Sequence, residues 1–116
     1  MSDIFIYHNP RCSKSRQTLA LLEEQDIKPN VIEYLKAPPT EVELSEIIDQ
    51  LGIMARDLLR KGEAEYKALN LADKSLTEQQ LIQAMCEHPK LIERPIVIHN
   101  GRAKIGRPPE AVLEIL

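Results

Sequence analysis

Residues 3–24 of the chain read DIFIYHNPRCSKSRQTLALLEE. Asp3 to Tyr7 is a short apolar run rich in β-formers, and it ends at His8-Asn9-Pro10, which predicts a strand followed by a loop. Ser13 to Glu24 places leucines at helical spacing. The stretch therefore predicts a strand, a loop and a helix, with Cys12 at the junction of loop and helix.

Two further segments predict the rest of a small sheet. Val31 to Tyr34 reads as a second strand, and the β-α-β order implies a right-handed crossover into a parallel pair. Ile96 to His99 and Arg102 to Ile105 flank Asn100-Gly101, the dipeptide best suited to a type I′ hairpin turn. We therefore expect a mixed sheet, with Cys12 near the carboxyl end of its first strand.

The remaining segments predict helices. Thr40 with Glu43, and Thr77 with Gln80, have the spacing of capping boxes. With 116 residues the chain can bury one core of ordinary size, so we expect a single domain over residues 1–116. Five helices are expected: one between Thr40 and Gly52, two short ones at Ala55 to Arg60 and Glu63 to Leu69, one from Thr77 through Cys86, and one from Pro108 to Leu116.

Composition and charge exclude several classes of function. The net charge is −3, from 15 basic and 18 acidic residues, so we expect no binding to nucleic acid or to an anionic membrane. The N-terminus, Met1-Ser2-Asp3, has no basic region, and no apolar stretch approaches about 18 residues, so we expect a cytoplasmic protein. Cys12 and Cys86 are far apart and no metal-binding spacing occurs, which argues against a disulfide or a metal site.

Cys12 is the best candidate for chemistry. A cysteine attacks as its thiolate, which is stabilised at a helix N-terminus by unpaired backbone N–H groups and the helix dipole. His8 precedes Cys12 on the same loop, and Ser15 can donate a hydroxyl hydrogen bond within the first helical turn. Positive charge is added locally by Arg11, Lys14 and Arg16.

The other cysteine and the histidines have plainer interpretations. A cytoplasmic cysteine is usually a small buried hydrophobe, and Cys86, late in a helix, keeps that interpretation because the dipole there disfavours a thiolate. His8 could equally be a solvent-exposed loop residue. His88 and His99 are expected to be surface residues without a special role.

The segment His8-Asn9-Pro10-Arg11-Cys12-Ser13-Lys14-Ser15-Arg16, followed by Thr18-Leu19, closely resembles the H-N-P-x-C-x-x-S-R-x-T-L segment of the arsenate reductase (ArsC) family. Arg60, Arg94 and Arg107 also lie where that family requires arginines. The resemblance implies a thioredoxin-like α/β fold, with a small mixed β-sheet flanked by helices and a helical insertion. It also implies a cis peptide bond before Pro95.

The resemblance implies an activity as well. Cys12 would be the nucleophile, His8 and Ser15 would stabilise its thiolate, and Arg60, Arg94 and Arg107 would bind an oxyanion through their planar guanidinium forks. The implied enzyme reduces arsenate, or a related oxyanion, with glutathione as reductant, glutaredoxin as partner and no bound cofactor. No second cysteine lies near Cys12 in the sequence, so an external thiol is expected to resolve the adduct.

Ser13 and Lys14 replace the glycine and threonine usual in resistance-type enzymes, so another oxyanion or a thiol adduct could be the substrate of the enzyme. Two other classes of function also stay open, each with weak or no arsenate activity. A monothiol glutaredoxin-like exchanger fits Cys12 and Ser15 but not the three arginines. A regulator that binds RNA polymerase would be expected to carry a second cysteine at the position of Ser15.

Overall fold

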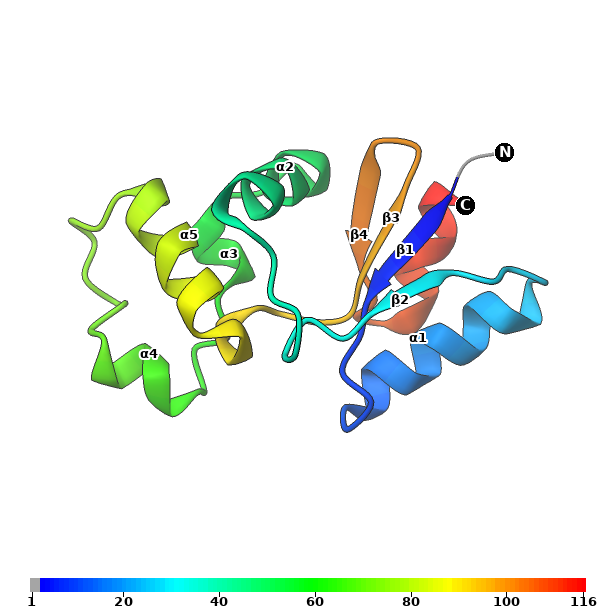
Figure 1. Cartoon of the computed structure of the whole chain (residues 1–116), viewed down its shortest axis with the longest axis horizontal. Helices are drawn as coiled ribbons and strands as arrows, with labels where there is room; N and C mark the ends of the chain where they lie inside the picture. The colour runs from blue at the N-terminus through cyan, green and yellow to red at the C-terminus, as the bar shows by residue number, and fades with distance from the viewer. Residues whose placement is uncertain (1–2) are drawn as a thin grey trace. The chain divides into compact units, whose positions relative to one another are not determined.

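The computed structural model describes residues 3–116; Met1 and Ser2, which begin the N-terminal segment discussed above, lie outside the described residues. The chain forms two compact units. The first combines Met1–Ala37 with Arg94–Leu116, and the second, Pro38–Glu93, interrupts it in sequence. Figure 1 shows that the strands belong to the first unit and that the second is helical.

The first unit is built on a four-stranded sheet in the order β2-β1-β3-β4. β1 pairs with β2 in parallel and with β3 antiparallel, and β3 pairs with β4 antiparallel, which confirms the mixed sheet. Asn100 and Gly101 have φ angles of 55° and 74°, which confirms the positive backbone angles expected of the hairpin turn. The strands are β1 (Ile4–Tyr7), β2 (Asn30–Ile32), β3 (Ile96–His99) and β4 (Arg102–Ile105).

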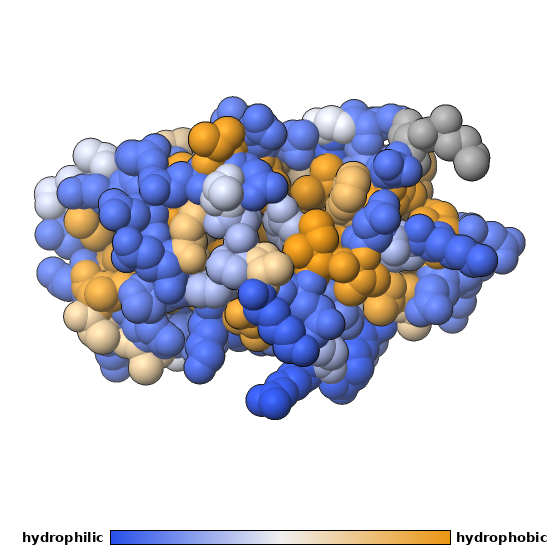
Figure 2. Space-filling model, in the orientation of Figure 1, coloured by the Kyte–Doolittle hydropathy of each residue, from blue (hydrophilic) through white to orange (hydrophobic). Residues whose placement is uncertain are grey.

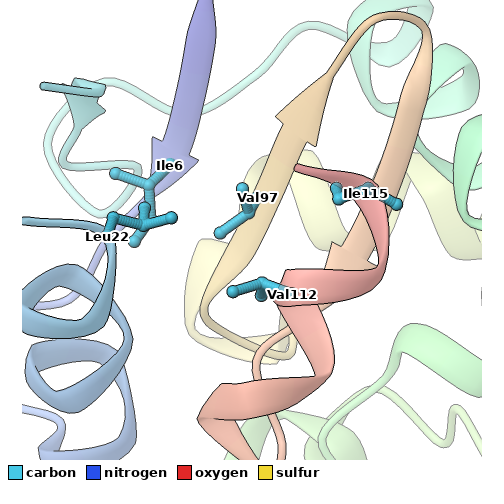
Figure 3. Packing of buried hydrophobic residues seen from close by; sticks show 5 residues of the cluster. All are labelled: Ile6, Leu22, Val97, Val112 and Ile115. Carbon is cyan, nitrogen blue, oxygen red and sulfur yellow. The ribbon is translucent and has the colours of Figure 1, made fainter. Parts of the chain in front are cut away.

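One face of this sheet is covered by α1 (Ser13–Glu24) and by η2 (Pro109–Ile115), the red helix of Figure 1. The core between them is apolar, because strand residues facing this side meet the buried stripe of each helix. Figure 3 shows the five central side chains, which come from β1, α1, β3 and η2. They are Ile6, Leu22, Val97, Val112 and Ile115.

The C-terminal segment is helical, as predicted. It forms η2, a 3-10 helix of 7 residues. Pro108 is its N-cap and Pro109 its first residue, where proline is tolerated because an N–H there would have no partner within the helix. His99 is half-buried and its Nδ1 donates to the Ile115 carbonyl at 2.6 Å, so it ties this helix to β3 instead of being a surface residue without a role.

The second unit packs its helices around α5 (Glu78–Glu87), which contacts α2, α3 and η1. Both capping boxes are present, Thr40 with Glu43 and Thr77 with Gln80, as the sequence predicts. Gly52 ends α2 in the left-handed region at φ 71°. The other elements are α2 (Glu41–Leu51), α3 (Ala55–Leu58), α4 (Ala64–Ala68) and η1 (Pro89–Leu91).

The surface seen in Figure 2 is largely hydrophilic, with hydrophobic residues in separate patches. Among the large exposed hydrophobic residues, Val42 and Met54 are the most accessible, at 70% and 59%. Single exposures of this kind are common in folded proteins. Across residues 3–116, none of the helices has the length and apolar character needed to span a membrane.

Candidate functional site

Cys12 is the N-cap residue of α1, directly after the loop that leaves β1. Its N–H donates to the Asn9 carbonyl and its own carbonyl accepts the N–H of Arg16, each at 3.0 Å. The first N–H groups of a helix lack partners within it and form the positive end of the dipole. Within α1, which the structure describes completely, no acidic residue occupies the first turn. Cys12 therefore lies at a position where the helix stabilises negative charge.

The side chains of His8 and Ser15, on either side of Cys12 in the sequence, form a hydrogen bond with each other. The Ser15 hydroxyl oxygen is 2.7 Å from His8 Nδ1 and accepts the backbone N–H of Asn9 at 3.0 Å. His8 is 6% exposed and Ser15 is fully buried, so His8 is not a solvent-exposed loop residue. These bonds fix the loop's shape around the start of α1, and direct stabilisation of the Cys12 thiolate by either side chain stays a prediction.

The protonation of His8 follows from its surroundings. Burial lowers the pKa of His8, the cation of Arg16 lowers it further, and the carboxylate of Glu33 acts in the opposite direction. The imidazole is therefore neutral at pH 7. The neutral ring and the Ser15 hydroxyl share one hydrogen bond at Nδ1, and the tautomer of the ring decides which of the two groups donates.

Arg107 reaches the sulfur of Cys12. Its Nη2 lies 3.5 Å from Cys12 Sγ, although the two residues are 95 positions apart. Its Nε donates to the Arg94 carbonyl at 2.8 Å, which fixes the direction of the guanidinium. A guanidinium stays charged throughout the physiological pH range, and its hydrogen bond to a sulfur anion is charge-assisted. Arg107 therefore adds a fixed cation to the helix N-terminus.

Close packing on α1 positions the loop that carries Arg107. A Cβ at Gly106 would lie 2.5 Å from Thr18 Oγ1 and 2.9 Å from Pro95 Cγ, distances that no side chain tolerates without movement. The Gly106 N–H donates to the Pro95 carbonyl at 2.9 Å. The Arg94–Pro95 peptide bond is cis, as expected, and the Arg107–Pro108 bond is cis as well. Glycine at this position thus lets the loop approach α1 and the proline together.

Arg94 lies at the start of the chain's return to the first unit. The residue is half-buried, and its Nε and Nη1 atoms are shielded from solvent. Its carbonyl oxygen holds Arg107, so the backbone of Arg94 contributes to the site in addition to its guanidinium. Two nitrogens of the head group are thus buried, and its part in binding an oxyanion stays a prediction.

Arg60 belongs to the second unit, where it follows α3. Its N–H donates to the Leu91 carbonyl at 2.8 Å. Its guanidinium pairs with the carboxylates of Glu63 and Glu93, at 2.5 Å and 3.6 Å. Both partners lie in the same unit, so Arg60 is a half-buried cation held by two acids. Its part in binding an oxyanion stays a prediction.

Cys86 has the opposite environment. It lies in the last turn of α5 and is partly exposed. Burial raises the pKa of the Cys86 thiol, and the carboxylates of Glu41, Glu87 and Glu43 raise it further. The side chain is therefore a neutral thiol at pH 7, in line with the plain role predicted for it.

The sequence indicates Arg16 only as a local positive charge and assigns no role to Thr18. Arg16 Nη1 donates to the Pro10 carbonyl at 2.9 Å and braces the loop before Cys12. Thr18 is fully buried, and its hydroxyl donates to the Lys14 carbonyl at 2.8 Å, beneath Gly106. The sequence does not show that Thr18 is buried against Gly106, because the contact between these two residues depends on the fold. Within residues 3–116 no group of three or more His, Cys, Asp or Glu side chains is placed to hold a metal ion.

The site thus has a single cysteine at a helix N-terminus of an α/β fold, with the guanidinium of Arg107 in contact with the cysteine sulfur. The model of the ArsC family matches residues 7–115, and the chain belongs to the ArsC family. This membership and the matching structures establish the thioredoxin-like fold with its small mixed sheet and helical insertion.

Several known proteins are similar over nearly the whole chain. The Escherichia coli (strain K12) protein named "Uncharacterized protein YfgD" is 58% identical, with 96% of this chain and 94% of that one covered. An arsenate reductase of Haemophilus influenzae is 52% identical, with 97% and 98% covered. The solved structure of an arsenate reductase from Vibrio cholerae is 57% identical with a TM-score of 0.97, and 98% of each chain is covered.

Proposed function

We propose that this protein is an arsenate reductase that uses glutathione and glutaredoxin as its source of electrons. The observation that carries the proposal is the guanidinium of Arg107, held 3.5 Å from the sulfur of Cys12 at the N-terminus of α1. The names of the similar proteins support arsenate as the substrate. A nucleophilic sulfur and an anionic substrate both need positive charge, and this site supplies it to both.

The arginines have complementary tasks in the proposed reaction. Arsenate is a tetrahedral anion, and a planar guanidinium binds two of its oxygens at once. Arg107 and Arg94 come from adjacent loops of the first unit, linked by the bond from Arg107 Nε to the Arg94 carbonyl. The family resemblance adds Arg60 as a third ligand. The first-turn N–H groups of α1 donate to the remaining oxygens.

The first chemical step is attack of the Cys12 thiolate on arsenic. A sulfur–arsenic bond forms and an arsenic–oxygen bond breaks, and the oxygen leaves as water after protonation. The glutathione thiol then forms a second sulfur–arsenic bond and displaces another oxygen as water. Arsenic remains in its +5 state up to this point, and Cys12 carries the adduct.

Reduction requires a second thiol. The glutaredoxin thiolate attacks the glutathione sulfur, and the electron pair of the sulfur–arsenic bond passes to arsenic, which becomes As(III). Glutaredoxin leaves as its mixed disulfide with glutathione. Water then displaces the Cys12 thiolate and releases arsenite. Two thiols are oxidised for the two electrons that arsenic gains.

The proposal of an external reductant is supported by the cysteines of the chain. Only two are present, and the first unit contains Cys12 alone. Ser15 stands where a resolving cysteine would be expected in a dithiol site, and its hydroxyl is bonded to His8. A resolving thiol is therefore proposed to come from another molecule.

The test is arsenate-dependent oxidation of NADPH, with glutathione, glutaredoxin and glutathione reductase present. We expect turnover with the protein, none with Cys12→Ser, and unchanged turnover with Cys86→Ser. A parallel assay replaces the glutathione system with thioredoxin and thioredoxin reductase, and we expect no turnover there. Turnover only with thioredoxin would contradict the proposed reductant, and reduction of mixed disulfides without arsenate turnover would favour a monothiol exchanger.

A further inference from the structure

A pocket of about 220 Å³ borders the loop that leads to Cys12. One wall is the loop itself, from His8 to Arg11, and the other is the segment after β2, with Glu33, Leu35 and Lys36. All of these residues belong to the first unit. The proposed reaction assigns no ligand to this pocket, although it begins at the residue next to the nucleophile.

The charged side chains of the pocket are available to a ligand. Arg11 and Lys36 are exposed and Glu33 is partly exposed. Lys36 Nζ lies 3.6 Å from Glu33 Oε1, in a pair whose side chains are 81% and 43% exposed. Exposed ion pairs contribute little to stability, so either partner can exchange the other for a ligand group at small cost.

The pattern of charge matches one kind of thiol. Glutathione carries an ammonium and a carboxylate on a single carbon at its γ-glutamyl end, and a second carboxylate at its glycyl end. The pocket offers a carboxylate beside an ammonium, Glu33 with Lys36, and a separate guanidinium, Arg11. Each charge of the peptide therefore has an opposite partner, and adjacent charges meet adjacent charges.

We propose that this pocket is the binding site for glutathione, a proposal that rests on the reductase function proposed above. The γ-glutamyl end pairs with Glu33 and Lys36, the glycyl carboxylate pairs with Arg11, and Leu35 contacts the methylene groups between them. An oxyanion such as arsenate fits this pocket less well, because Glu33 would repel it.

The length of glutathione is compatible with this placement. A tripeptide extends over roughly 10 Å, at about 3.3–3.6 Å for each residue. Arg11 and Cys12 are consecutive, so their Cα atoms lie about 3.8 Å apart. The pocket therefore ends at the residue that precedes the nucleophile, and a ligand of this length that fills it can extend toward Cys12.

Binding can be tested without any reaction. S-methylglutathione keeps all three charges but has no thiol, and it can be titrated into the full chain while amide resonances are recorded by NMR. We expect saturable shifts at the pocket residues, and binding about tenfold weaker in Lys36→Glu. Lys28→Glu, an equal charge reversal at an exposed lysine outside the pocket, should bind as the unaltered protein does.

A second probe tests the acidic partner. N-acetyl-S-methylglutathione lacks the ammonium. We expect it to bind the unaltered protein more weakly than S-methylglutathione does. In Glu33→Gln, which lacks the carboxylate that pairs with the ammonium, we expect the two probes to bind equally. Absence of saturable shifts, or equal affinity in Lys36→Glu, would overturn the proposal. So would equal affinity of both probes for the unaltered protein.

The coupled assay separates this proposal from the function on which it rests. In Lys36→Glu we expect the KM for glutathione to rise about tenfold, with kcat at saturating glutathione unchanged. An unchanged KM with normal arsenate turnover would refute the pocket and leave the reductase standing. Binding of S-methylglutathione by a protein that does not turn over arsenate would support the pocket and refute the substrate.

Discussion

Cys12 and Cys86 are the same residue type at opposite ends of two helices. Cys12 precedes α1, beside the positive end of the dipole and the guanidinium of Arg107. Cys86 lies in the last turn of α5, where burial raises the pKa of its thiol and neighbouring carboxylates raise it further. Cys12 is only 8% exposed, whereas Cys86 is more accessible. The two cysteines therefore differ in the charge around the sulfur, which is a guanidinium and a helix N-terminus at Cys12 and a group of carboxylates at Cys86.

The largest expected effect comes from removing the cation at Cys12. Arg107→Gln makes the surroundings of the sulfur more like those of Cys86, and it removes an oxyanion ligand. We expect kcat/KM for arsenate to fall by about 10²-fold or more, as for loss of one preorganised donor. Arg102→Gln, an exposed arginine on β4, is the matched control and should retain activity. Equal activity in both variants would show that Arg107 has no part in the reaction.

A smaller effect is expected from moving the loop that carries this arginine. Gly106→Ala places a Cβ against Thr18 and Pro95, so the loop must shift. We expect the free energy of unfolding, measured with urea, to fall by about 1–3 kcal/mol. Gly62→Ala is the control, because its Cβ would meet nothing within 4 Å. If Gly106→Ala is as stable as Gly62→Ala, the loop does not approach Thr18 and Pro95 as closely as the structure shows.

The smallest expected effect concerns His8 and pH. Burial lowers the pKa of His8, so below about pH 6.5 the unfolded chain binds a proton that the folded chain resists. The contribution of His8 to stability is therefore present above that pH, and it is lost as pH falls toward the lowered pKa. Urea unfolding at several pH values should show a weaker acid dependence in His8→Asn. An unchanged dependence would mean that His8 is not buried as a neutral ring.

Much of the fold could be predicted because its signals are local. α1 has the predicted bounds, and both capping boxes and the hairpin turn are present. These features depend on residues a few positions apart. The helix at η2 was predicted as well, although its 3-10 type was not. The helical second unit was implied by the family resemblance alone, because the division into two compact units depends on contacts between residues that are distant in sequence.

The candidate site could be predicted only in part from its residues. The loop-to-helix position of Cys12 follows from the sequence, but its contact with Arg107 joins residues 95 positions apart. Only the family resemblance pointed to that arginine. The bond between His8 and Ser15 was not foreseen, because both side chains were expected to act on Cys12. Side-chain direction within a loop depends on packing that local patterns do not encode.

Competitive alkylation of the two cysteines measures which thiol is the better nucleophile. The folded protein is treated with less than one equivalent of iodoacetamide at pH 7, and mass spectrometry measures the modification of Cys12 and Cys86. We expect Cys12 to react first although it is less exposed, and we expect Arg107→Gln to reduce this preference. Faster modification of Cys86 would show that exposure governs reactivity and that the helix N-terminus and Arg107 do not activate Cys12.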